Sequence, residues 1–217
     1  MTYKTPEEAF LDTGIIAIMR GIEGADLMKM VEALYEGGIR LAEVTLNTPG
    51  ALSAIRELRT RFDGKMFIGA GTVITLEKAH QAIDAGAQFL VTPNVDPEII
   101  RLCILSNIWI TPGAFTPTEI VTAMNLGCRY IKLFPVRALG PAYIKDVLAP
   151  LSDARLLAVG GVDAKNIGDY IKAGAVGAGV GGSLCRVPSN REFSLAANEA
   201  KALLSAVRQA KGITDRV

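Results

Sequence analysis

Tyr130-Ile131-Lys132-Leu133-Phe134-Pro135 is a short apolar segment with one lysine in its middle. Its composition is typical of a buried strand, and Pro135, which has no N–H, ends the hydrogen-bonding ladder. A lysine in such a strand loses hydration, which disfavours its ammonium form, and the neutral amine is a nucleophile towards ketones. Most lysines instead reach water at a strand edge. The segment alone leaves both interpretations of Lys132 open.

The segment belongs to a strand–helix unit that recurs along the whole chain. A predicted helix at 117–126 precedes it and a predicted helix at 143–148 follows it. Seven further apolar segments read as strands, at 15–19, 41–46, 67–70, 89–92, 108–110, 156–159 and 176–180. The other predicted helices lie at 26–36, 49–61, 76–85, 97–106, 166–173 and 192–211. Eight strands thus alternate with eight helices, which is typical of an α/β fold.

The connections between these units indicate how the sheet is arranged. Several predicted helices end in a glycine just before the next strand, at Gly38, Gly86, Gly127 and Gly174. The strands are apolar on both faces, as in a parallel sheet covered by helices. Eight right-handed crossovers predict a (β/α)₈ TIM barrel, preceded by a short helix from Pro6 to about residue 11. A doubly wound open sheet is the alternative, but the first strand lacks its usual Gly-x-Gly-x-x-Gly motif. Because no linker divides residues 1–217, we expect a single domain.

Composition excludes several classes of function. The chain has 23 basic and 22 acidic residues, a net charge of +1, which gives no electrostatic footprint for nucleic acid or a membrane surface. No apolar run reaches the roughly 18 residues of a membrane helix, and the N-terminus lacks a signal-peptide apolar region. Three widely spaced cysteines are typical of reduced thiols in a cytoplasmic protein. His80 is the single histidine, so a site built on several imidazoles is excluded, and metal-dependent chemistry would have to use carboxylates alone. We expect neither a metal nor a cofactor.

In a barrel of this kind, catalytic groups lie at the C-terminal ends of the strands. The first strand ends at Arg20. In the second, Glu43 alternates with apolar residues that face the helices, so we expect it to point into the barrel. A solvated carboxylate at the strand edge is the alternative for Glu43. The third strand ends in Gly69-Ala70-Gly71-Thr72, where the glycines allow close backbone approach and Thr72 offers a hydroxyl.

Two glycine-rich loops follow the seventh and eighth strands, where such barrels commonly bind phosphate. They contain Gly160-Gly161 and Gly181-Gly182-Ser183, whose backbone N–H groups would form an anion nest unless the loops are merely flexible. The predicted barrel mouth therefore combines an amine, a carboxylate, a guanidinium, a hydroxyl and a phosphate nest. These groups suit a phosphorylated keto acid, with Lys132 adding to its ketone and Glu43 moving protons.

Several segments together resemble the class I 2-keto-3-deoxy-6-phosphogluconate (KDPG) and 4-hydroxy-2-oxoglutarate aldolase family. They are Glu43-Val44-Thr45-Leu46, Ile68-Gly69-Ala70-Gly71-Thr72-Val73, Val91-Thr92-Pro93, Lys132-Leu133-Phe134-Pro135 and Gly160-Gly161-Val162. The resemblance implies a (β/α)₈ homotrimer that forms pyruvate and an aldehyde reversibly. It assigns the Schiff base to Lys132, acid–base catalysis to Glu43 and substrate contacts to Thr72 and Pro93. It also assigns the phosphate to Gly160, Gly161, Gly181, Gly182 and Ser183.

Departures from the gluconate-type pattern bear on the substrate. Asn47 stands where many such members have arginine, and Val159 stands where they tend to have threonine. Four segments look more like the 2-keto-3-deoxy-6-phosphogalactonate (KDPGal) aldolases: Leu46-Asn47-Thr48-Pro49, Val91-Thr92-Pro93-Asn94, Gly140-Pro141-Ala142-Tyr143-Ile144-Lys145 and Ala158-Val159-Gly160-Gly161-Val162. In those aldolases, an arginine at the Arg20 position is a substrate ligand. The two sugar acids differ at C4, so one lost hydroxyl partner can bias the choice. We expect the galactonate acid, with the gluconate acid as the alternative.

Two other functions share part of this pattern. A phosphosugar isomerase or decarboxylase barrel would keep the phosphate loops but would need no imine. A non-catalytic sugar-phosphate sensor would need neither Lys132 nor Glu43. Because the chain has both residues, the sequence favours the aldolase.

Overall fold

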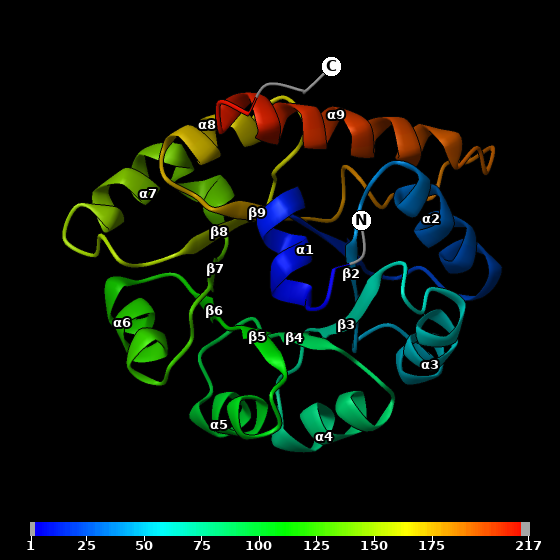
Figure 1. Ribbon diagram of the computed structural model, residues 1–217, viewed down its shortest axis with the longest axis horizontal. Helices are drawn as coiled ribbons and strands as arrows, with labels where there is room; N and C mark the ends of the chain where they lie inside the picture. The colour runs from blue at the N-terminus through cyan, green and yellow to red at the C-terminus, as the bar shows by residue number, and fades with distance from the viewer. Residues whose placement is uncertain (1–2, 214–217) are drawn as a thin grey trace.

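The computed structural model describes residues 3–213 and has the predicted α/β barrel architecture (Figure 1). Parallel strands form a nearly closed ring in the hydrogen-bonded order β5-β4-β3-β2-β1-β9-β8-β7-β6. The strands are β1 (Ile15–Met19), β2 (Leu41–Thr45), β3 (Phe67–Gly71), β4 (Phe89–Val91), β5 (Trp109–Thr111), β6 (Gly113–Ala114), β7 (Ile131–Leu133), β8 (Leu156–Val159) and β9 (Gly177–Val180).

Within the part of the chain that the structure describes, eight helices cover the outside of the ring, and a further one, α1, lies across one of its mouths (Figure 1). They are α1 (Pro6–Thr13), α2 (Gly24–Glu36), α3 (Ala51–Arg61), α4 (Leu76–Asp84), α5 (Pro97–Leu105), α6 (Pro117–Asn125), α7 (Gly140–Leu148), α8 (Ile167–Lys172) and α9 (Ser194–Ala210), with a 3₁₀ turn η1 (Val136–Ala138) after β7. Among the described residues, no helix is long and apolar enough to cross a membrane.

The strand count differs from the expected eight because a short strand, β6, follows β5, which corresponds to the predicted segment 108–110. Pro112 separates β5 from β6, since a proline has no N–H to donate to the ladder. Its carbonyl still takes part, because the backbone N–H of Lys132 donates to the Pro112 oxygen at 2.9 Å. β5 and β6 are the two ends of the hydrogen-bonded order, so the ring formed by the described strands opens at this proline.

Local signals in the sequence explain where the helices begin and end. Thr5 caps α1 by accepting a hydrogen bond from the Glu8 N–H at 3.1 Å, and Thr116 and Glu119 form a reciprocal capping box on α6. The predicted stop glycines all adopt the left-handed conformation, with φ of 99°, 92°, 94° and 111° at Gly38, Gly86, Gly127 and Gly174. Each connection therefore turns directly into the next strand.

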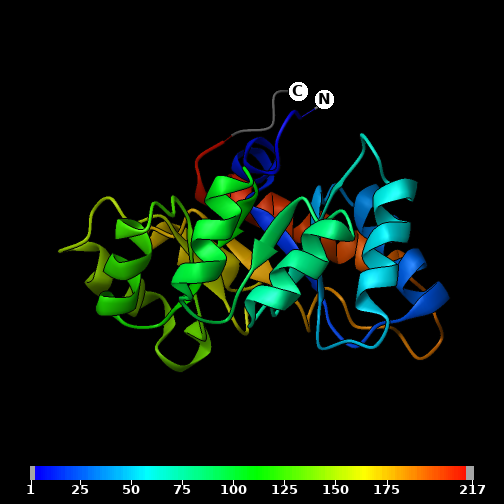
Figure 2. The ribbon, with the colours of Figure 1, turned by 90° about the horizontal axis from the view of Figure 1, so that it is seen from below.

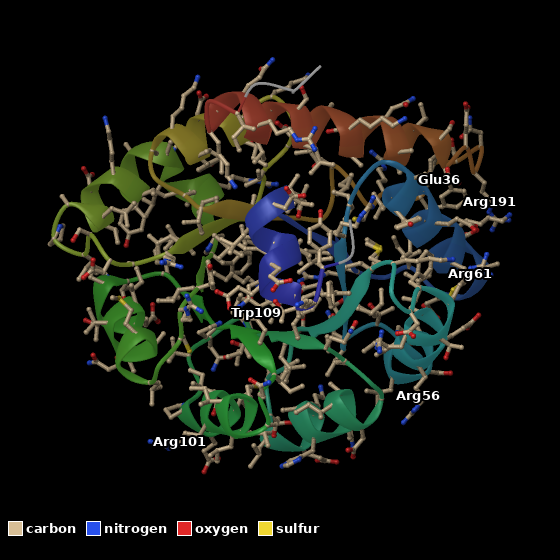
Figure 3. The ribbon with its side chains drawn as sticks, viewed as in Figure 1. Glu36, Arg56, Arg61, Arg101, Trp109 and Arg191 are labelled. Atoms are coloured by element: carbon tan, nitrogen blue, oxygen red, sulfur yellow. The ribbon has the colours of Figure 1, made fainter. Side chains whose placement is uncertain are left out.

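The mouth where the strands begin is closed by aromatic side chains. Phe10 of α1 packs on Trp109 and Tyr130, with ring centroids 5.5 and 5.6 Å apart. Figure 3 shows Trp109 beside α1 near the centre of the ring. The loops after β1 and β9 lie on the opposite side of the ring from α1 (Figure 2). Since side chains fill the first mouth, we look for the active site at this second mouth, where the strands end.

Candidate active site

Two ionisable side chains project into the barrel interior. Glu43 from β2 is 1% exposed and Lys132 from β7 is 5% exposed. The neighbours of Glu43 on the strand, Ala42 and Val44, pack instead with the helices in the outer core. Strand alternation thus turns Glu43 inward, because successive side chains point to opposite faces. An acid and an amine therefore share a low-dielectric interior.

Gly71 makes room for the Glu43 carboxylate. A Cβ placed on Gly71 would lie 2.5 Å from Oε1 of Glu43, so only glycine fits at this point of β3. The Oε2 atom of Glu43 is buried and has no hydrogen-bond partner among the described residues. Buried polar atoms nearly always have such a partner, so this oxygen retains full capacity to accept one. The environment favours the protonated carboxylic acid.

Burial shifts the titration of both groups towards their neutral forms. Desolvation raises the pKa of Glu43 to about 7, although the positive charges of Lys132 and Arg20 oppose the shift. Desolvation also lowers the pKa of Lys132, helped by Arg20 and opposed by the Glu43 carboxylate. Glu43 can therefore both donate and accept a proton near neutral pH, and Lys132 has an increased fraction of nucleophilic amine.

A cavity of about 480 Å³ opens at the mouth above these groups. Lys132 reaches it from β7, with Nζ 4.9 Å from the centroid of the Phe134 ring. Arg20, which follows β1, and Val159, which ends β8, line it as well. The remaining lining residues are Ile18, Phe134, Arg137, Gly160, Gly161, Val162, Asp163, Gly179, Gly181, Gly182, Ser183 and Cys185.

The two glycine loops form one ordered wall of this cavity. Gly160 and Gly161 have φ of 106° and 79°, a conformation that glycine adopts without strain. The Asn166 amide donates to the Gly161 oxygen at 2.9 Å, which holds the first loop. The Ser183 hydroxyl donates to the Val162 oxygen at 3.0 Å and so ties the second loop to the first. These two hydrogen bonds therefore connect the first loop to Asn166 and the second loop to the first.

Thr72 and Pro93 lie at the strand ends but are not among the residues that line the cavity. Thr72 directly follows β3 and has a φ of 56°, which is uncommon for a residue other than glycine and is found often at functional sites. Pro93 packs against the backbone of Gly113, the residue in register with Lys132 on the neighbouring strand. Pro93 is therefore one strand away from Lys132, whereas Thr72 is placed only at the end of β3.

Sequence reasoning missed several cavity residues. Arg137 lies in the 3₁₀ turn η1, which has neither strand nor helix periodicity, and Asp163 lies in the loop after β8. Cys185, whose role the sequence did not indicate, also lines the cavity, and burial raises the pKa of its thiol. His80 is exposed on α4 and does not line the cavity. No group of three or more His, Cys, Asp or Glu in residues 3–213 could hold a metal ion.

Comparisons with known proteins show which proteins the chain resembles. The family model of KDPG and KHG aldolase matches residues 7–194. The chain is 38% identical to 2-dehydro-3-deoxy-6-phosphogalactonate aldolase of Escherichia coli K12 over 90% of this chain and 95% of that protein. A native KDPGal structure superposes with a TM-score of 0.87 at 36% identity, covering 98% of this chain and all of the other. KDPG aldolase from Legionella pneumophila, with pyruvate captured as a covalent carbinolamine, gives a TM-score of 0.83 at 30% identity over 93% and 99% of the chains.

Proposed function

Because the chain belongs to the KDPG and KHG aldolase family and is therefore a lyase, we propose that it cleaves 2-keto-3-deoxy-6-phosphogalactonate to pyruvate and glyceraldehyde 3-phosphate. The observation that carries this proposal is Lys132, a buried lysine of lowered pKa that reaches the cavity and faces a buried carboxyl. A phosphosugar isomerase or a sugar-phosphate sensor would require neither group. The reaction needs no metal and no cofactor, because a protonated imine supplies the electron sink.

The proposed mechanism begins with the Lys132 amine. Its nitrogen attacks C2 of the keto acid, and the ketone oxygen takes up a proton to give a carbinolamine. Loss of water then gives a protonated imine. The C3–C4 bond breaks as the C4 hydroxyl loses its proton, and the bonding electrons flow into the imine to form an enamine. Glyceraldehyde 3-phosphate leaves, the enamine gains a proton at C3, and water releases pyruvate and the free amine.

Glu43 is the proposed acid and base for these transfers. It donates a proton to the departing water, accepts one when the C–C bond breaks, and returns one to C3 of the enamine. A pKa of about 7 suits both directions, because such a group is populated in both protonation states at neutral pH. The Oε2 atom, which lacks a partner among the described residues, has the free capacity that proton transfer requires.

The substrate's two anionic ends are assigned to opposite parts of the cavity. Arg20, which lines the cavity with Lys132, and Thr72 and Pro93, which follow β3 and β4, are the proposed contacts of the keto-acid portion. The phosphate is assigned to the loops with Gly160, Gly161, Gly181, Gly182 and Ser183, whose backbone N–H groups suit an anion. The sugar chain then spans the wall between them, where Val159 lies.

Val159 is the proposed determinant of the C4 preference. Its side chain is 5% exposed and lies in the interior at the end of β8. Valine cannot hydrogen-bond a C4 hydroxyl of either configuration, whereas threonine could, so valine relaxes or inverts a gluconate preference. The 38% identity to an E. coli relative that is named for the galactonate acid supports this acid as the substrate of the chain. The gluconate acid stays a second candidate, since the Legionella relative is named a KDPG aldolase.

The proposal is tested by measuring kcat/KM for pyruvate release from both phosphorylated acids. We expect cleavage of both, with the galactonate acid preferred or equally accepted. Lys132→Arg keeps the charge but provides no titratable nucleophile, so it should lose activity by several orders of magnitude. Retained cleavage in a folded Lys132→Arg variant would rule out the imine mechanism. Strong wild-type selectivity for the gluconate acid would overturn the substrate assignment alone.

We further infer that the chain, residues 1–217, is a single (β/α)₈ domain in which β5 and β6 are halves of one strand interrupted by Pro112. We propose that it acts in the cytoplasm as a homotrimer, the state that the family resemblance implies. Light scattering of the purified protein tests the trimer: a mass of about three chains of 23.0 kDa is expected, and a monomer or dimer would contradict it.

A further inference from the structure

Arg137 is a cavity residue for which neither the sequence pattern nor the proposed mechanism has a role. It lies in η1, the turn that follows the strand carrying Lys132, and it lines the same cavity as both glycine loops. Its side chain is exposed at the mouth, where a ligand would also contact solvent. Arg137 therefore lies beside the phosphate end of the proposed substrate.

The guanidinium of Arg137 lies directly over the first glycine loop. A Cβ placed on Gly161 would be 2.5 Å from Nε and 3.2 Å from Nη2 of Arg137. Glycine at 161 thus has two consequences: it permits the left-handed turn, with φ of 79°, and it lets the guanidinium rest on the backbone. Any larger residue would push the cation away from the loop. The turn and the arginine form one structural unit.

No protein anion neutralises this guanidinium within residues 3–213, where no ion pair or hydrogen bond involves Arg137. Among the described residues that line the cavity, Asp163 is the sole carboxylate. Its Oδ1 atom instead accepts the backbone N–H groups of Lys165 and Asn166, at 2.9 and 3.1 Å. The arginine is therefore free to bind an anion at the loop surface.

The charges of the cavity lining match a substrate with two anionic ends. Arg20, Lys132 and Arg137 are its basic residues, against the single acidic Asp163. Backbone N–H groups of the glycine loops contribute dipoles, whereas Arg137 adds a full positive charge with donors in a fork that fits phosphate oxygens. A full charge discriminates strongly between a dianionic phosphate and a neutral hydroxyl, because its attraction scales with the ligand's charge.

We propose that Arg137 binds the phosphate of the substrate and sets the site's preference for phosphorylated over unphosphorylated 2-keto-3-deoxy acids. This inference rests on the proposed aldolase function and adds a specificity residue to it. Arg137 takes no part in the chemistry at Lys132, so its contribution appears in binding the phosphorylated substrate.

The test compares Arg137→Gln and Arg137→Lys with the wild type on the galactonate substrate, with and without its phosphate. Arg101→Gln is the matched control, since Arg101 is exposed on α5 at the edge of the molecule (Figure 3). We expect Arg137→Gln to lower kcat/KM about 10-fold for the phosphorylated acid, mainly through KM, because a charge-assisted hydrogen bond is lost. The unphosphorylated acid should be unaffected. Arg137→Lys should fall between, because it keeps the charge and loses the fork.

Inhibition by inorganic phosphate gives a second readout that is independent of turnover of the unphosphorylated acid. The inhibition constant should rise about 10-fold in Arg137→Gln and stay unchanged in Arg101→Gln. Equal losses on both acids with unchanged phosphate inhibition would show that Arg137 only supports the turn, and no loss at all would equally overturn the proposal. Borohydride trapping of pyruvate distinguishes failure of the Arg137 proposal from failure of the aldolase proposal. If pyruvate is trapped on Lys132 but Arg137→Gln leaves the preference for the phosphorylated acid unchanged, only the Arg137 role is refuted. If no pyruvate is trapped in the wild type, the aldolase function is refuted.

Discussion

Replacing Glu43 with glutamine should change how the stability of the protein depends on pH. The pKa of Glu43 is about 7 in the folded protein, against 4.5 for an ordinary glutamate. Between these values the folded state binds more protons than the unfolded state, so the free energy of unfolding falls as pH rises through this window. At about 1.4 kcal/mol per pKa unit, a difference of about 2.5 units gives a loss of about 3 kcal/mol by pH 8 to 9.

Glu43→Gln keeps the shape of the side chain but removes its titration. The variant should therefore gain about 3 kcal/mol relative to the wild type between about pH 4.5 and 8.5. A buried amide carries its own cost, but that cost is the same at every pH. Losing the Glu43 charge also lowers the pKa of Lys132 further. A lysine of lowered pKa destabilises the fold most at low pH, so the variant becomes more stable as pH rises. This second effect therefore adds to the gain that the variant shows over the wild type with rising pH.

Urea unfolding, followed by circular dichroism at one protein concentration and ionic strength, measures the effect from pH 4.5 to 9. Glu57→Gln is the control, because Glu57 is exposed on α3. The unfolding free energy of Glu43→Gln should rise relative to that of the wild type as pH rises. The difference in unfolding free energy between Glu57→Gln and the wild type should be the same at every pH. Parallel curves for wild type and Glu43→Gln would refute the claim that burial raises the pKa of Glu43.

Three further outcomes follow from the site. Glu43→Gln should lower turnover by about 10²–10⁴-fold with pyruvate binding weakly altered, and near-normal turnover would assign the protons to another group. Gly71→Ala should lower stability by about 1–3 kcal/mol in thermal melts and reduce activity, because its Cβ meets the Glu43 carboxylate. Gly168→Ala, with no atom closer than 4.0 Å, is its control, and equal melting of both would contradict the packing argument. Val159→Thr should move the kcat/KM ratio of the two acids towards gluconate by roughly 2- to 13-fold, and an unmoved ratio would remove Val159 from substrate choice.

Much of the barrel could be predicted because its strands are apolar runs with clear ends. The predicted segments 15–19 and 156–159 agree with β1 and β8 to the residue. Helix starts were less predictable where a turn precedes them. α3 begins at Ala51 instead of 49 because Gly50 adopts a left-handed φ of 69°. α7 begins at Gly140 instead of 143, since Pro141 is compatible with the first turn of a helix.

The site was predictable where strand geometry fixes it. Alternation along β2 was enough to point Glu43 inward, and strand order was enough to bring the two glycine loops together. Packing at the mouth was not accessible in the same way. The position of Arg137 over Gly161 depends on the path of a 3₁₀ turn, and no periodic pattern encodes that path.

The central claim is that Lys132 forms an imine with the substrate ketone, and borohydride reduction in the presence of pyruvate tests it most directly. Borohydride converts an imine to a stable secondary amine, which peptide mapping by mass spectrometry then locates. The account predicts irreversible inactivation, a pyruvate adduct on the peptide that contains Lys132, and no adduct in Lys132→Arg. An adduct on another residue, or none in the wild type, would contradict it.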